Sequence, residues 1–187
     1  GQRSLGLVLQ RAVKACANRL AVALLAWVAL GICGCATSGR QAVPNLAIVA
    51  PGIYRGGQPT AEGWQAIMAL GVTNVVKLNA ESEGSDAEAE RLGAVVHRLP
   101  ISGWEQMCAG VPRERLEAAC ELLTPGTYVH CLHGQDRTGL VVASYRVRSG
   151  WSHREAEAEM IRLGFHPLLV GLWQTWRDGK AHMLEAR

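Results

Sequence analysis

The chain has 187 residues, of which 49% are hydrophobic and 19% are charged, and its formal net charge is +3. Four basic residues and no acidic residue lie in positions 1–34, so the remaining 153 residues carry a net charge of −1. That remainder is long enough for one domain with its own core, and its charge argues against nucleic acid as a partner.

Positions 1–34 are predicted to be an export signal. Basic residues precede an uninterrupted apolar run from Leu20 to Ile32, which is shorter than the roughly 18 residues that a membrane-spanning helix needs. A basic start, a short apolar run and small residues after it are typical of a secretory signal peptide. Two alternatives stay open: an ordinary cleaved signal whose cysteines are incidental, and an uncleaved membrane anchor.

The end of that run, Ile32-Cys33-Gly34-Cys35, resembles the bacterial lipobox, in which the final cysteine receives lipid and becomes the mature N-terminus. Cys35 fits the lipobox better than Cys33 because the small residue Gly34 precedes it. The resemblance implies that lipid on Cys35 holds the protein at a membrane. Ala36, the next residue, implies sorting to the outer membrane of a Gram-negative cell, facing the periplasm.

The sequence therefore predicts three regions. A signal peptide occupies residues 1–34, a lipidated N-terminus with a linker occupies residues 35–50, and a single domain occupies residues 51–187. The linker is expected to be flexible because small and polar residues such as Thr37 and Ser38 follow Cys35.

Strands and helices are predicted to alternate along the domain. β-branched runs favour strands, apolar residues three or four positions apart favour helices, and capping residues and glycines mark the helix ends. The alternation predicts an α/β fold with a central, mainly parallel sheet flanked by helices. Strands are expected over residues 53–55, 72–78, 94–99 and 127–130, helices over residues 61–70, 87–92 and 152–163, a further helix around Leu116, Ala119, Cys120 and Leu123, and an acidic loop over residues 81–86.

The segment His130–Gly139 carries the main functional pattern, in which a cysteine and an arginine lie six positions apart in the order H-C-x5-R-T-G. A strand is predicted to end at His130 and a helix to begin near Leu140, so the segment is a strand-to-helix loop. Main-chain N–H groups and the helix dipole favour an anion at such a loop. Arg137 can bind two phosphate oxygens at once, and the positive surroundings favour the nucleophilic thiolate of Cys131.

This pattern resembles the signature of the cysteine-dependent protein tyrosine and dual-specificity phosphatases. The segment from Gly52 to Thr60, with the sequence GIYRGGQPT, looks like the opening strand and turn of compact bacterial and fungal members. The resemblance covers roughly residues 50–170. It implies a phosphatase domain that hydrolyses phosphomonoesters of proteins, lipids or small molecules, and that uses no metal or other cofactor.

The resemblance also implies a role for each residue of the loop. Cys131 attacks phosphorus, and Arg137 holds the phosphoryl oxygens. The hydroxyl of Thr138 hydrogen-bonds the cysteine sulfur and helps it to leave in the second step. The residues expected to order the loop or to line the bound phosphate are His130, Leu132, His133, Gly134, Gln135 and Gly139.

The general acid has two candidates. Phosphoryl transfer to cysteine expels an alkoxide, which needs a proton. Asp136 lies directly before Arg137, where a subset of bacterial phosphatases carries an Asp that is proposed as the acid. Many relatives use an Asp after the third strand instead, but residues 99–106 hold a single carboxylate, Glu105. Asp136 is therefore predicted as the acid ahead of Glu105, and the alternative is an Asp136 that faces outward and pairs with an arginine.

The remaining cysteines and histidines have less specific interpretations. Cys108 and Cys120 could form a disulfide in an oxidising compartment, but Cys120 lies on an apolar helix face, which favours a free buried thiol. A metal site made of His130, Cys131 and His133 is disfavoured, because the loop points these side chains in different directions and no further Cys-x2-Cys pair is present.

Taken together, these patterns predict a lipid-anchored phosphatase. Two other classes of protein stay open. One is a lipoprotein that binds phosphate without turnover, and the other is a rhodanese-like sulfur transferase, which also holds an anion in a loop that begins with cysteine. The Thr138-Gly139 ending and the position of Arg137 favour the phosphatase.

Overall fold

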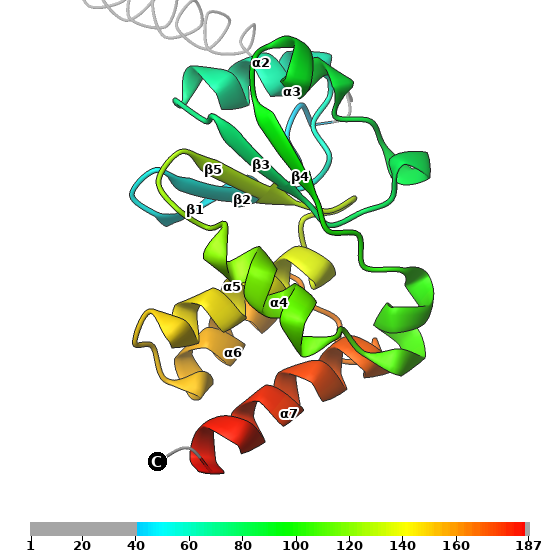
Figure 1. Ribbon diagram of the computed structural model, residues 1–187, viewed down its shortest axis with the longest axis vertical. Coiled ribbons are helices and arrows are strands. Elements are labelled where there is room, and N and C mark those ends of the chain that lie inside the picture. Colours follow the sequence, from blue (N-terminus) through cyan, green and yellow to red (C-terminus); the bar gives the residue numbers. More distant parts are fainter. Residues whose placement is uncertain (1–40, 186–187) are drawn as a thin grey trace, which may run out of the picture. The chain divides into compact units, whose positions relative to one another are not determined.

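The computed structural model describes residues 41–185. Within this range a five-stranded sheet has the order β1-β2-β5-β3-β4, and β1 alone runs antiparallel to its neighbour (Figure 1). The predicted α/β fold with a mainly parallel sheet is thus confirmed. The strands are β1 (Ala47–Ala50), β2 (Ile53–Gly56), β3 (Asn74–Lys77), β4 (Val95–Arg98) and β5 (Thr127–His130).

Helices cover both faces of the sheet (Figure 1). One face carries α2 (Ala61–Ala69) and α3 (Ala87–Arg91). On the other side of the sheet lie α4 (Arg113–Glu121) and α5 (Asp136–Arg148), and α6 (His153–Arg162) and α7 (Val170–Glu185) pack against α5. Two short helices, the 3₁₀-helix η1 (Glu81–Glu83) and the π-helix η2 (Glu105–Ala109), follow β3 and β4.

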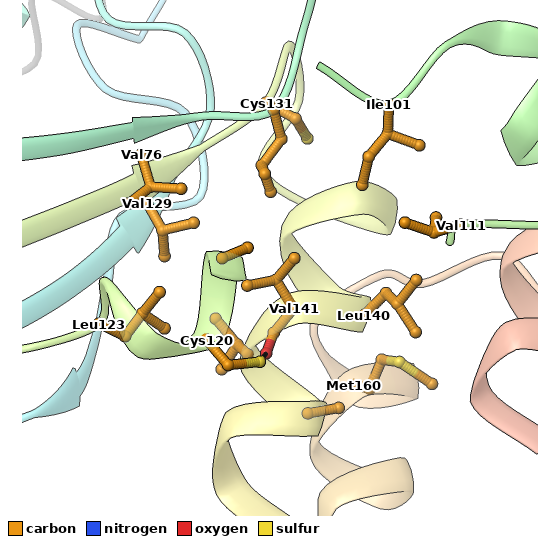
Figure 2. Close-up of a cluster of buried hydrophobic side chains, with 14 of the residues drawn as sticks. Val76, Ile101, Val111, Cys120, Leu123, Val129, Cys131, Leu140, Val141 and Met160 are labelled. Atoms are coloured by element: carbon orange, nitrogen blue, oxygen red, sulfur yellow. Dashed lines mark hydrogen bonds between the residues drawn. The ribbon is translucent and has the colours of Figure 1, made fainter. Parts of the chain in front are cut away.

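Each helical layer has its own core, because successive residues of a strand point to opposite faces of the sheet. Val75 and Tyr128 are fully buried with Trp64 of α2. Their neighbours Val76 and Val129 pack into the larger core on the other side. Figure 2 shows this larger core between the sheet and α5, with Leu140 and Val141 on the helix, and Cys131 belongs to the same cluster.

The predicted helix ends are confirmed. The hydroxyl of Thr60 caps α2 by accepting a hydrogen bond from the N–H of Gly63 at 3.2 Å. Ser152 and Glu155 form the capping box of α6. Gly164, just after α6, has a φ of +91°, a conformation that glycine adopts without strain.

The domain begins before residue 51, which corrects the predicted linker over residues 35–50. Val43 is buried, and the carbonyls of Ala42 and Pro44 accept hydrogen bonds from Thr60 at 2.9 Å and Gly57 at 2.6 Å. Strand β1 then pairs with β2. Residues 41–50 are therefore part of the domain. The first 40 residues, with the predicted signal peptide and lipobox, lie outside the described residues.

The helices η2 and α7 were not predicted from the sequence. Helix α7 buries Leu172 and Trp176, and η2 packs against its first turn, where Gly171 lies close to the main chain of Glu105 and Cys108. None of the described helices is both long enough and apolar enough to cross a membrane.

Candidate active site

The strand-to-helix loop lies at the centre of the sheet. Strand β5 ends at His130 between β2 and β3, and α5 begins at Asp136, so Cys131 to Gln135 form the loop between them. Gly134 has a φ of +74°, and a Cβ atom there would overlap the main chain of Gly56 and Gly57. Glycine is therefore required at this position both for its backbone conformation and for the close approach of β2.

The carbonyls of the loop are bonded from outside. Arg55 donates to the carbonyl of Gly134 at 2.8 Å, and the main-chain N–H of Gln58 donates to that of Leu132 at 3.0 Å. The amide of Asn45 donates to the carbonyl of His133 at 2.8 Å. With its carbonyls turned outward, the loop can turn N–H groups inward, and the N–H of Gly134 donates to Sγ of Cys131 at 3.3 Å. Inward N–H groups of this kind would suit an oxyanion.

Cys131 and Arg137 both lie in this loop region, and each is largely buried. The exposed fraction is 2% for Cys131 and 5% for Arg137. Burial alone would lower the pKa of Arg137, but hydrogen bonds to Glu83 and the nearby Cys131 sulfur outweigh it and raise that pKa. A cation is thus fixed beside the sulfur.

Glu83 of η1, which sequence reasoning left in an acidic loop, is the main partner of Arg137. Its two carboxylate oxygens accept from Nη1 and Nη2, each at 2.8 Å. These hydrogen bonds from Arg137 lower the pKa of Glu83. Nη1 also donates to the carbonyl of Ile101 at 3.3 Å. The guanidinium is therefore held at its outer edge by a bidentate pair.

A buried polar network holds His130, and its acidic member was also missed. Nε2 of His130 lies 2.9 Å from Asp86, which also accepts from Lys77 at 3.1 Å and Gln58 at 2.8 Å. Asp86 and His130 are fully buried, and Lys77 is 1% exposed. Burial alone would raise the pKa of Asp86, but the contacts with His130 and Gln58 outweigh it, so the pKa is lowered.

Position along the sheet could have indicated both acidic residues. Glu83 and Asp86 follow β3, and the carboxyl ends of β3 and β5 lie side by side in the parallel sheet. Sites of α/β proteins form at that edge. The order of the strands therefore predicts that the acidic loop after β3 lies beside the cysteine loop after β5.

The two predicted acids have different surroundings. Glu105 accepts hydrogen bonds from the main chain and hydroxyl of Ser102 at 2.7 Å and 2.9 Å and pairs with Arg115. Burial would raise the pKa of Glu105, but these contacts outweigh it and lower the pKa. Asp136 pairs with His166 instead of the arginine that the alternative interpretation named, and Nδ1 of His166 lies 3.0 Å from Oδ1 of Asp136.

Thr138 does not make the predicted hydrogen bond to the cysteine sulfur. Its side chain is fully buried in the first turn of α5, and its Oγ1 has no hydrogen-bond partner among the described residues. A buried hydroxyl without a partner is unfavourable. The structure thus leaves Oγ1 of Thr138 free to bond a group bound in the loop or a displaced sulfur.

The other residues predicted to surround the phosphate differ in their exposure and in what they contact. Leu132 is half-buried and His133 is exposed. The side chain of Gln135 is turned toward Gly164, and Gly139 packs against Met160 and Phe165 one turn into α5. Gly139 is therefore a position of close packing between helices, and its place around the phosphate stays a prediction.

Cys108 and Cys120 do not pair in the described part of the chain, and the free buried thiol that was favoured for Cys120 is confirmed. Both thiols are free, and Cys108 is exposed. Cys120 is buried, and its Sγ lies 3.6 Å from the carbonyl of Val141, as the dashed line in Figure 2 marks. Burial raises the pKa of Cys120 to about 12, which keeps this thiol protonated and unreactive.

Comparison with known proteins gives one family match. Residues 49–151 match the family described as polymorphic toxin system, DSP-PTPase phosphatase. The match includes β2 to β5, the loop, and α5.

Two curated relatives each match more than half of this chain. Inositol diphosphatase DSP2 of Oryza sativa subsp. japonica is 28% identical over 57% of this chain and 55% of that protein. Dual specificity protein phosphatase TpbA of Pseudomonas aeruginosa is 31% identical over 74% of this chain and 61% of that protein. The chain thus matches little more than half of the length of these relatives.

Solved structures have the same fold. The crystal structure of P. aeruginosa TpbA superposes with a TM-score of 0.61 at 25% identity, covering 72% of this chain and 84% of that one. The core catalytic domain of the PP-IP phosphatase SIW14 from S. cerevisiae superposes with a TM-score of 0.57 at 22% identity, covering 67% and 80%.

Proposed function

The chain belongs to the DSP-PTPase phosphatases of polymorphic toxin systems, within the cysteine-dependent dual-specificity phosphatase superfamily, and from this membership we propose that it hydrolyses phosphomonoesters through a phosphocysteine intermediate. The observation that carries the proposal is the buried sulfur of Cys131, which accepts a loop N–H and lies beside the cation of Arg137. A thiolate within an oxyanion-binding loop is the arrangement that nucleophilic attack on phosphorus requires.

In the first step, the Cys131 thiolate attacks phosphorus, and the bond to the ester oxygen breaks. The electron pair of that bond stays with the leaving oxygen, which takes up a proton. Arg137, held by Glu83, and the N–H groups of the loop carry the charge of the three other oxygens. We propose that the general acid that supplies this proton lies on the Asp136 side of the loop, because Glu105 is already hydrogen-bonded to Ser102 and paired with Arg115.

In the second step, water attacks the phosphocysteine and loses a proton to the group that donated one before. The sulfur leaves as a thiolate. The unpaired hydroxyl of Thr138 supports a role in stabilising that thiolate, although it makes no bond to the sulfur in the resting loop.

A single substitution tests the proposed function. In the full chain, Cys131→Ser should abolish turnover of p-nitrophenyl phosphate, because serine at this position has no base to ionise it, while binding of the oxyanion tungstate is retained. Cys108→Ser is the matched control, since Cys108 is an exposed thiol outside the loop, and should keep wild-type turnover. Wild-type turnover in Cys131→Ser would contradict the proposal.

We propose aryl phosphates, of the phosphotyrosine type, as the substrate class. Residues 132–136 contain neither Lys nor Arg, which favours substrates with few charges over polyphosphorylated ones. Trp104, 69% exposed, lies three residues after Ile101, whose carbonyl accepts a hydrogen bond from Arg137, and we propose its ring as the aromatic surface for an aryl substrate. TpbA from P. aeruginosa has been crystallised with phosphotyrosine, whereas the rice relative is an inositol diphosphatase.

A substrate panel decides between these classes. We expect kcat/KM to be highest for a phosphotyrosine peptide, lower for a phosphoserine peptide, and lowest for an inositol polyphosphate. A preference for the inositol polyphosphate would contradict the proposed substrate class while leaving the phosphatase mechanism intact.

We further propose that the chain is exported and anchored by lipid on Cys35, facing the periplasm. The support is the sequence pattern of residues 20–35. In cells given a labelled fatty acid, Cys35→Ala should lose the label and Cys33→Ala should keep it. Label that persists in Cys35→Ala and disappears in Cys33→Ala would assign the lipid to the other cysteine.

A further inference from the structure

Each acidic side chain near the loop is already engaged in a specific contact. Glu83 binds Arg137 through both oxygens, and Asp86 lies fully buried between His130 and Lys77. Glu105 is bonded to Ser102 and Arg115. A general acid must present its proton to the leaving oxygen, and none of these three carboxylates presents one toward the loop.

Asp136 is engaged as well, and its partner is a histidine. Oδ1 of Asp136 accepts the main-chain N–H of His166 at 2.7 Å and lies 3.0 Å from Nδ1 of the same residue. The main chain therefore fixes His166 to Asp136, and the imidazole is oriented by a second contact to the same oxygen. Because Asp136 directly precedes Arg137 in the first turn of α5, this pair lies beside the phosphate-binding loop.

The segment that carries His166 is itself well anchored. Phe165, the residue before it, is 3% exposed and packs among the buried residues of α5 and α6. The carbonyl of His166 accepts from the N–H of Leu169 at 3.0 Å. The ring is held at Nδ1 but its side chain is 63% exposed, and Nε2 has no hydrogen-bond partner among residues 41–185. Its free nitrogen is thus available to a bound substrate.

We propose that His166 is the general acid of the phosphatase and that Asp136 is its positioning residue, an inference that rests on the proposed function. Asp136 accepts Nδ1–H and so orients the ring with Nε2–H toward the leaving oxygen. As Cys131 attacks phosphorus, the P–O bond breaks and its electron pair takes the Nε2 proton. His166 is then neutral and accepts a proton from the water that hydrolyses the phosphocysteine, which restores the starting state.

This assignment differs from direct donation by Asp136 in one measurable respect. If Asp136 donates the proton itself, its removal must cost more than the removal of His166. If His166 donates and Asp136 orients it, the loss of the imidazole must be the larger effect, because an asparagine at position 136 still offers an oxygen to the main-chain N–H of His166. A second exposed imidazole, His133, lies in the loop and provides the competing donor.

The test uses the full chain and aryl phosphates whose leaving groups need increasing protonation, from p-nitrophenyl phosphate to phenyl phosphate. We measure kcat/KM, since it reports the steps up to formation of the phosphocysteine. His166→Ala should lower kcat/KM for phenyl phosphate by about 10²–10⁴-fold, the range typical of a removed acid, and should affect p-nitrophenyl phosphate far less. Asp136→Asn should show the same dependence on leaving group with a smaller loss. The double variant should be no worse than His166→Ala.

Added imidazole provides a readout that a structural role would not give. It should restore part of the phenyl phosphatase activity of His166→Ala and should leave the wild type unchanged. His97→Ala is the matched control, because His97 contacts Asn74 at the first residue of β3, at the opposite end of the strand from the loop. It should retain wild-type kcat/KM for both esters.

Several outcomes would overturn the assignment. Equal losses on both esters in His166→Ala would reduce His166 to a structural residue. A larger leaving-group effect in Asp136→Asn would make Asp136 the direct donor, and one confined to His133→Ala would move the role to His133. A wild-type chain that hydrolyses neither ester would instead refute the phosphatase function, and the acid assignment with it.

Discussion

Glu83 determines how Arg137 is presented to a phosphoryl group. Its carboxylate occupies the outer edge of the guanidinium through two bonds of 2.8 Å, so the remaining N–H groups are fixed in direction before any substrate binds. Arginine carries considerable side-chain entropy, and a preorganised fork loses less of it on binding. Glu83 therefore acts on phosphate affinity without any need to contact the phosphate.

Replacement of Glu83 by glutamine should weaken oxyanion binding and make the domain less stable at neutral pH. We expect the inhibition constant of tungstate to rise roughly tenfold, equivalent to about 1.4 kcal/mol, because Arg137 is no longer held by a carboxylate. Glu81→Gln is the control, since Glu81 pairs instead with the exposed Arg98. Equal inhibition constants in wild type and Glu83→Gln would show that other contacts fix the guanidinium.

The same variant has a defined pH dependence. The bond from Arg137 lowers the pKa of Glu83 from its ordinary value of 4.5 in the unfolded chain. A lowered native pKa contributes stability that is fully present above pH 4.5 and is lost as the pH falls through the lowered value. The stability difference between wild type and Glu83→Gln in urea unfolding should therefore be largest near pH 7 and should shrink below about pH 4.

Single residues show how far the sequence could predict the site. Cys131 and Arg137 were found because their spacing is itself a motif. Glu83, Asp86 and His166 were not, because each reaches the loop through a tertiary contact across 30 or more residues. No local pattern marks such a contact. For Glu83 and Asp86, the signal that the sequence did offer was their position just after a strand of the parallel sheet.

At the scale of elements, the approach of β2 to the catalytic loop depends on glycine. Gly134 lies against the main chain of Gly56 and Gly57 at the end of β2, in a backbone conformation with positive φ. The close contact allows Gln58 and Arg55 to bond the loop carbonyls on either side of His133. The glycines on both segments thus permit the outward orientation of the carbonyls that leaves the N–H groups for an anion.

Gly134→Ala should therefore disrupt the loop. The positive φ costs an alanine roughly 1 kcal/mol or more, and the clash with β2 adds to it. We expect turnover of p-nitrophenyl phosphate to fall, by about tenfold for each 1.4 kcal/mol by which the altered loop destabilises the transition state. We also expect the variant to unfold at a lower urea concentration. Gly103→Ala, at a glycine with open space around it, should change neither measurement. Unaltered turnover in Gly134→Ala would mean that β2 yields to the new methyl group.

The elements that the sequence predicted are those with strong local signals. The capped helices α2 and α6 and the β-branched strands β3 and β5 have such signals. Strand β1 does not, because its Ile48 is 70% exposed and the strand depends on β2 for its hydrogen bonds. Helix α7 was missed because Gly171 and Gly179 lie within it and weaken the local helical signal, although its buried Leu172 and Trp176 are four residues apart.

At the scale of the whole molecule, residues 41–50 belong to the folded domain. They bury Val43 and Val49, pair β1 with β2, and bond Gly57 and Thr60. The domain boundary predicted from small and polar residues lay ten residues too late, because composition does not report the partners that a short segment finds in the rest of the fold.

A comparison of two truncated chains tests this boundary. A chain that begins at Gln41 should unfold cooperatively in urea, whereas a chain that begins at Pro51 should unfold at a clearly lower urea concentration, because the apolar surface covered by Val43 and Val49 becomes exposed. The loss for two valines is about 3 kcal/mol or more. Identical unfolding midpoints would restore the later boundary and make residues 41–50 an accessory segment.

Asn45 donates its hydrogen bond to the carbonyl of His133, so the start of the domain lies directly at the phosphate loop. Asn45 lies ten positions after Cys35, and an extended chain of that length spans at most about 36 Å. If Cys35 carries the proposed lipid, this distance is the radius within which the enzyme can work above the bilayer. Phosphate esters on lipid headgroups, or on protein segments close to the membrane, fall inside that radius, and those farther out must diffuse to it.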